Sequence, residues 1–209
     1  MKRIGLALIL GMVFSTAAFA YNAPDRTGKF DAGFNVSGVF PNEDSASDTA
    51  YVGGSLDYGI NPEWALGFQA GWASMGMKAH NVAGNVISVG DADVIPILAN
   101  LTYRIPVSSN PVSPYVTYGL GGVIAKHSGN RDLDTNQLSA TGSDGFAMKF
   151  AGGVDWFVND SGNWILNLEG GYMWTDASLD IHRFSDGSQV DSKDLDYWYI
   201  GGGVKYLFS

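Results

Sequence analysis

The chain has 209 residues, of which 28 are glycines, 13% are aromatic and 16% are charged, and it contains no cysteine. Its 21 acidic residues outnumber its 12 basic residues and set the formal net charge at −9, which argues against nucleic acid as a partner. Many glycines and aromatics with only 7 prolines favour alternating β-strands over a disordered chain or a helical membrane protein, and the absence of cysteine excludes a disulfide framework.

The first twenty residues have the pattern of a secretory signal peptide. Lys2 and Arg3 precede an apolar run over 4–14, and Ala18-Phe19-Ala20 forms a small-x-small cleavage site, with cleavage expected before Tyr21. A retained membrane helix is the alternative, but the run is shorter than the roughly 20 apolar residues that a span needs. We therefore expect residues 1–20 to be removed, leaving a mature chain of 10 basic and 21 acidic residues with a net charge of −11.

Eight segments of the remaining chain alternate apolar and polar side chains with the period of two that is typical of half-exposed strands. In the segment 64–74, for example, Trp64, Leu66 and Phe68 share one face and Gln69 lies on the other. The eight predicted strands are 29–40, 51–60, 64–74, 94–104, 115–126, 146–157, 164–175 and 195–209.

The last strand has the strongest alternation. Trp198, Val204 and Phe208 fall on one face, whereas glycines and Lys205 fall on the other. A strand with one aromatic and apolar face is in contact with lipid or with a core, and a C-terminal strand that ends on an aromatic residue resembles the insertion signal of bacterial outer-membrane barrels.

Short and long connections alternate between these strands, and the long ones are 41–50, 75–93, 127–145 and 176–194. Outer-membrane barrels have short periplasmic turns and longer extracellular loops. The sequence therefore predicts an all-β fold, an eight-stranded antiparallel up-and-down transmembrane β-barrel over 21–209, with both termini in the periplasm. A soluble sandwich or a lipocalin-like barrel, in which the apolar face would be a core, is the competing interpretation.

Charged side chains lie on the face opposite the apolar one in most of these strands. In a closed barrel they would face a narrow lumen and could pair there, whereas in a sandwich they would face solvent. The predicted lumen network consists of Asp31, Asp57, Arg104, Lys149, Asp155, Glu169 and Lys205.

The mouth of the last strand offers a candidate lumen entrance. Tyr197 and Tyr199 are predicted to face inward just below the last long connection, where they would line an apolar entrance or simply pack under the loops. Inward glycines leave room for a narrow channel, although eight strands normally enclose only their own side chains or one small ligand.

The sequence has no catalytic motif and no dedicated metal site. His80, His127 and His182 all fall in long connections, and His127 with Ser128, or His182 with Ser185, are the only pairs of a base and a nucleophile. No fixed acidic partner can be named for either pair, so we expect no enzyme activity and no cofactor. The acidic connections could bind calcium, or bridge to lipopolysaccharide through divalent cations, but their spacing matches no calcium loop.

Several stretches resemble the OmpW family of small bacterial outer-membrane barrels. They are the runs 151–160, 164–176 and 197–208, with Pro96 ahead of a strand that ends at Arg104. The resemblance covers nearly the whole mature chain, although similar patterns recur in OmpX-type and OmpA-type barrels. It implies a narrow channel that passes small apolar solutes through an apolar lumen and a lateral opening, in contact with outer-membrane lipid and lipopolysaccharide. A barrel that does not transport and acts in structure or adhesion through its extracellular loops is the alternative.

Overall fold

The computed structural model describes residues 24–80, 86–107, 111–129, 138–158, 162–183 and 187–208. The predicted signal peptide, 1–20, lies outside these residues. No helix in the described part of the chain is long and apolar enough to cross a membrane.

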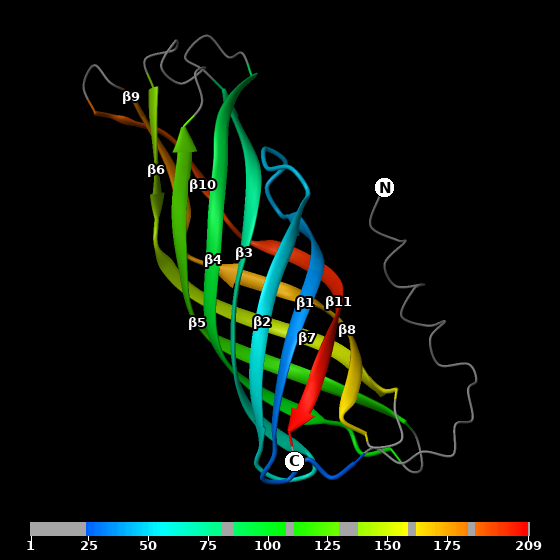
Figure 1. Cartoon of the computed structure of the whole chain (residues 1–209). Coiled ribbons are helices and arrows are strands. Elements are labelled where there is room, and N and C mark those ends of the chain that lie inside the picture. The colour runs from blue at the N-terminus through cyan, green and yellow to red at the C-terminus, as the bar shows by residue number, and fades with distance from the viewer. Residues whose placement is uncertain are drawn as a thin grey trace.

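Eight antiparallel strands form a closed barrel in the order β1-β11-β8-β7-β5-β4-β3-β2 (Figure 1). The predicted fold class is therefore confirmed, and each of the eight predicted strands is present. The barrel strands are β1 (Phe30–Pro41), β2 (Thr49–Gly59), β3 (Trp64–His80), β4 (Val86–Arg104), β5 (Val112–Gly129), β7 (Gly145–Phe157), β8 (Trp164–Thr175) and β11 (Tyr197–Phe208).

Residues that were predicted to face outward or inward on the barrel wall do so in the structure. Phe34, Leu66 and Leu168 point outward, with exposed fractions of 58%, 53% and 42%, whereas Asp31 and Asp155 are buried inside. A slip of one residue would exchange the two faces of a strand, so this agreement establishes the register of the wall. An outward surface of large apolar side chains is suited to contact with hydrocarbon.

Aromatic rings pair across neighbouring strands near both ends of the wall. Trp64 and Tyr103 pair at the end with the short turns, with ring centroids 4.9 Å apart, and Tyr172 and Trp198 pair toward the long connections, 4.8 Å apart. Aromatic side chains at these two levels are typical of the membrane interfaces of such barrels. We refer to the two ends of the barrel as the short-turn end and the long-connection end.

The long connections contain more strand than the sequence predicted. β3 and β4 continue as a hairpin beyond the predicted ends, with Met75 opposite Ala92 and a register shift at Met77, so most of 75–93 is not a loop. The prediction was wrong here because strand pairing does not need lipid. An antiparallel ladder continues for as long as both partners can bond, and the alternation of Met75 and Met77 does continue.

A second sheet stands at the long-connection end (Figure 1). It has three strands in the order β10-β9-β6, formed by β6 (Leu138–Ser143), β9 (Ser178–Arg183) and β10 (Gln189–Asp194). Parts of 127–145 and 176–194 were expected to be loops. These segments of six residues form strands because their few apolar side chains, Leu138, Leu179 and Ile181, are buried against the barrel interior.

Candidate functional site

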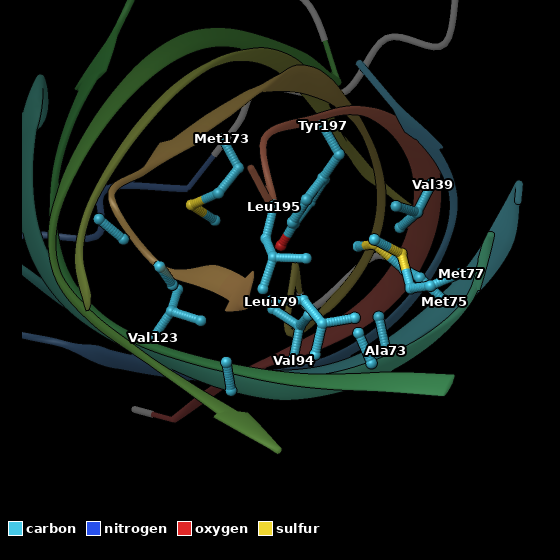
Figure 2. Packing of buried hydrophobic residues seen from close by; sticks show 14 of the residues in the cluster. Val39, Ala73, Met75, Met77, Val94, Val123, Met173, Leu179, Leu195 and Tyr197 are labelled. Carbon is cyan, nitrogen blue, oxygen red and sulfur yellow. The ribbon is translucent and has the colours of Figure 1, made fainter. Parts of the chain in front are cut away.

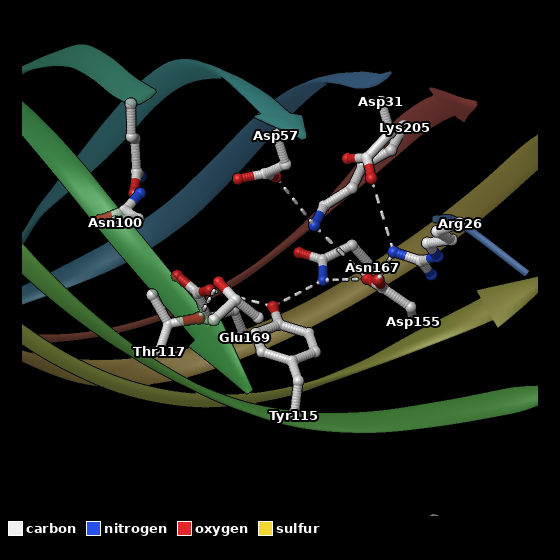
Figure 3. Close-up of polar contacts among 12 residues, drawn as sticks. Arg26, Asp31, Asp57, Asn100, Tyr115, Thr117, Asp155, Asn167, Glu169 and Lys205 are labelled. Carbon is white, nitrogen blue, oxygen red and sulfur yellow. Dashed lines mark hydrogen bonds and ion pairs between the residues drawn. The ribbon is translucent and has the colours of Figure 1, made fainter. Parts of the chain in front are cut away.

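The barrel interior is divided into two layers, and the one nearer the short-turn end is charged. Figure 3 shows the polar contacts within it. We call it the charged layer. It contains all seven residues of the predicted network and one more, Arg26. The seven come from β1, β2, β4, β7, β8 and β11, so nearly the whole circumference of the wall contributes.

One group of ion pairs is centred on two carboxylates near the short-turn end. Arg26 Nη1 lies 2.8 Å from Asp155 Oδ2 and 3.5 Å from Asp31 Oδ2, and Arg104 Nη2 lies 3.6 Å from the same Asp31 oxygen. Lys205 Nζ lies 3.6 Å from Asp155 Oδ1 and 3.7 Å from Asp57 Oδ2. Each carboxylate in this group therefore has at least one cationic neighbour.

A second group lies deeper in the lumen. Lys149 Nζ lies 2.8 Å from Glu169 Oε1 and donates a hydrogen bond of 2.6 Å to Gln69 Oε1. Tyr115 and Tyr199 donate their hydroxyl hydrogens to the two oxygens of Glu169, at 2.9 and 2.8 Å. Glu169 is thus held by one cation and two phenols.

Asn167 joins the two groups. Its Nδ2 donates to Asp155 Oδ1 at 2.9 Å and to the hydroxyl of Tyr115 at 2.7 Å, and Tyr115 in turn donates to Glu169. The charged layer is therefore one continuous network. Breaking a buried ion pair by removing one partner typically costs about 3–5 kcal/mol, so such a network resists partial opening.

Arg26 was missed by the sequence analysis because it precedes the first strand and has no place in the alternation. The seven predicted residues comprise four acids and three bases, and Arg26 brings the described charged layer to four of each. That imbalance was the available signal, because an unpaired carboxylate inside a closed lumen is costly.

A cavity of about 40 Å³ remains within the charged layer. Arg26, Arg104 and Asn100 line it, and each has a buried polar atom without a hydrogen-bond partner within the described protein. A water molecule needs roughly 10–15 Å³ and two to four polar partners, so this space suits a few waters and no larger solute.

The layer nearer the long-connection end is apolar (Figure 2). Its side chains come from the barrel wall, from the second sheet and from Ala177 and Leu195 in the connections. We call it the apolar layer. Its buried members are Val39, Tyr51, Ala73, Met75, Met77, Val89, Ala92, Val94, Leu98, Val123, Ala125, Leu138, Ala147, Met173, Ala177, Leu179, Ile181, Leu195, Tyr197 and Tyr199.

The two tyrosines of the candidate entrance both point inward. Tyr197 is only 2% exposed within the apolar layer, and Tyr199 is 8% exposed at the boundary with the charged layer, with its ring 5.8 Å from Lys149 Nζ. Neither lines an open mouth in this structure. Their role as an entrance therefore stays a prediction, and it requires side chains above them to move.

The space that was expected beside the inward glycines is occupied by tyrosine rings. A Cβ at Gly53 or Gly71 would meet the ring of Tyr51, and a Cβ at Gly153 would meet the ring of Tyr115. These glycines thus make room for buried rings, not for an open channel.

The β3–β4 ladder has a gap beside the boundary between the layers, in addition to the register shift at Met77. The β3–β4 register pairs Ala70 with Ile97 and Ala73 with Val94, but the two positions between them are not among the described pairs. One of those positions is Pro96, which has no N–H to donate. The interruption therefore lies between the polar level of Gln69 and the apolar level of Ala73.

The histidines form no catalytic arrangement among the described side chains. A ring nitrogen of His127 lies 2.8 Å from the carbonyl oxygen of Val89, so its partner is backbone and not Ser128. Ser185 lies outside the described residues. The described residues also contain no cluster of three or more His, Asp or Glu that could hold a metal ion.

Fold and interior together define a small transmembrane β-barrel with a filled lumen. The sequence profile of the family described as "Outer membrane protein beta-barrel domain" matches residues 6–208, so the chain belongs to that family and to the bacterial outer membrane. A comparison with curated proteins found no match.

Solved structures with the same fold support this assignment. OprG from Pseudomonas aeruginosa is 16% identical, with a TM-score of 0.74 over 89% of this chain and 98% of that one. Outer membrane protein W of E. coli is 18% identical, with a TM-score of 0.53 over 88% and 99%. Neisserial surface protein A is 16% identical, with a TM-score of 0.50 over 86% and 97%. The resemblance to small outer-membrane barrels of the OmpW type is confirmed at the level of family and fold.

Proposed function

We propose that the protein is a narrow conduit that carries small apolar solutes from the cell surface through the apolar layer and sideways into the membrane. The observation that carries this proposal is the position of the β3–β4 interruption. It lies at the floor of the apolar layer, directly above the charged layer.

The charged layer makes a straight route through the barrel unfavourable. An apolar solute would have to separate paired charges, and the cavity there is only about 40 Å³. An exit through the wall at Pro96 avoids this layer, because the sheet lacks its regular pairing there. Met75, Met77 and Met173 line the apolar layer, and methionine side chains repack easily around irregular guests.

This route requires the long-connection end to face outside and both termini to face the periplasm, as the loop lengths predict. The outer face would then contact outer-membrane lipid and lipopolysaccharide. No enzyme activity, cofactor or nucleic acid is part of the proposal.

The test is uptake of N-phenyl-1-naphthylamine, an apolar probe that fluoresces in hydrocarbon, by intact cells with and without the protein. We expect the protein to accelerate uptake. Pro96→Ala, which restores an N–H to the interrupted ladder, should slow this acceleration severalfold. Pro114→Ala is the matched control, because Pro114 also lies in the wall but is paired with Val154 at the short-turn end.

Uptake that is identical with and without the protein would refute the proposal. Equal uptake by the Pro96→Ala and wild-type proteins would refute the lateral route. Folding of each variant is checked by the heat-dependent shift of the barrel on gels.

Surface structure or adhesion is the second candidate. The filled lumen and the second sheet favour it, because a plugged barrel with a built surface can present that surface to a partner. Unchanged probe uptake, together with stronger retention of expressing cells on a surface under flow, would select this function.

A further inference from the structure

We infer that residues 24–29 form a strap that closes the short-turn end of the barrel, and that Arg26 is the pin that fastens it inside the lumen. This inference does not depend on transport. It concerns access of water and small reagents to the charged layer from the short-turn end.

The strap is attached at both sides of the barrel mouth. Pro24 lies against Gly162, beside the start of β8, so closely that a Cβ at Gly162 would be 2.8 Å from its ring. At the other side, Gly28 N donates to Gly59 O at 2.8 Å, and Gly59 N donates to Lys29 O at 2.9 Å, which ties the strap to the end of β2. The chain thus crosses from β8 to β2, which are not neighbours in the barrel.

Arg26 projects from the middle of this crossing into the lumen. Only 3% of its surface is exposed, its guanidinium pairs with Asp155 and Asp31, and it lies 4.8 Å above the ring of Phe157. Phe157, Ile165 and Leu207 form a small buried cluster at the same end. The apolar cluster and the pinned strap together close the mouth.

Arg26 also lines the 40 Å³ cavity, and its buried Nη2 atom has no hydrogen-bond partner in the described protein. Water can supply that partner. Removal of the pin would therefore do two things. It would take one cationic neighbour from Asp31 and one from Asp155, which keep Arg104 and Lys205, and it would join the cavity to solvent.

Cysteine accessibility tests the seal, because the natural chain has no cysteine and Ser55 lines the cavity. The probe is methyl methanethiosulfonate, a small neutral thiol reagent, added to the folded Ser55→Cys protein in detergent. Its reaction rate is followed by mass. Asp48→Cys, an exposed position, supplies the rate for an open thiol.

In the Ser55→Cys background we expect slow labelling, and Arg26→Ala should accelerate it at least tenfold. Lys29→Ala is the matched control, since it removes a cation from the same strap without touching the lumen pairs. A second variant opens the strap through its backbone. A Cβ at Gly59 would strike the carbonyl of Arg26, so Gly59→Ala should also accelerate labelling, whereas Gly54→Ala, whose Cβ makes an ordinary contact, should not.

The inference would be overturned if the Ser55→Cys protein reacted as fast as the exposed thiol of Asp48→Cys. It would also be overturned if neither Arg26→Ala nor Gly59→Ala accelerated labelling while the heat-dependent gel shift persisted. If Arg26→Ala does not fold, Gly59→Ala with its control decides alone. Acceleration by Lys29→Ala equal to that by Arg26→Ala would also overturn the role of the pin.

Discussion

Leu168→Arg tests the position of the wall in the membrane. Leu168 is outward, and its register neighbours on β7 and β11 are Val154 and Gly202. With a rise of about 3.3 Å per residue and a tilt near 40°, each residue climbs about 2.5 Å along the barrel axis. Leu168 then lies about 10 Å above Trp164 and about 15 Å below Trp174, within about 3 Å of the centre of an apolar band about 25 Å tall.

An arginine at the midplane of such a barrel destabilises it by about 2–4 kcal/mol, and the cost falls to about 0–1 kcal/mol near the interfaces. Neither register neighbour of Leu168 is an acid that could pair with the new charge. The assay is a reversible urea titration of the barrel in phospholipid vesicles, followed by tryptophan fluorescence. Leu168→Met, of similar size and without charge, should cost less than about 1.5 kcal/mol.

A free energy of unfolding within about 0.5 kcal/mol of the wild type for Leu168→Arg would refute the placement of this face in hydrocarbon. The neighbouring inward residue, Asn167, is not a neutral control. Its side chain donates two hydrogen bonds, to Tyr115 and Asp155. With about 0.5–1.5 kcal/mol for each bond, Asn167→Ala should cost about 1–3 kcal/mol of unfolding free energy.

Two further predictions concern the charged layer and the orientation. Lys149→Met leaves Glu169 with its phenols but without its cation, and should cost about 3–5 kcal/mol of unfolding free energy. The double variant Lys149→Met, Glu169→Gln should regain much of this loss, and a double variant as unstable as the single one would contradict the pairing. Protease added to intact cells should cut within 127–145 or 176–194, and cuts confined to the short turns would reverse the proposed orientation.

The wall of the barrel could be predicted because its signal is local. Lipid on one side and a narrow lumen on the other force side chains to alternate with a period of two, so Phe34 and Asp31 reveal their faces without knowledge of their neighbours. The same alternation predicted that seven charged residues face the lumen. It did not predict how they pair, because Lys149 and Glu169 meet only when β7 and β8 lie side by side in register.

Only the tertiary structure decided what lies beyond the alternating segments. Arg26 belongs to no strand, and its place in the lumen depends on a strap held by Gly59 and Pro24 at separate points of the mouth. Leu179 and Ile181 belong to a segment too short and too polar to predict a strand, yet they close the apolar layer from above. The bilayer imposes a period on the wall, whereas the plug and the strap arise from contacts between residues far apart in the chain, which no local pattern encodes.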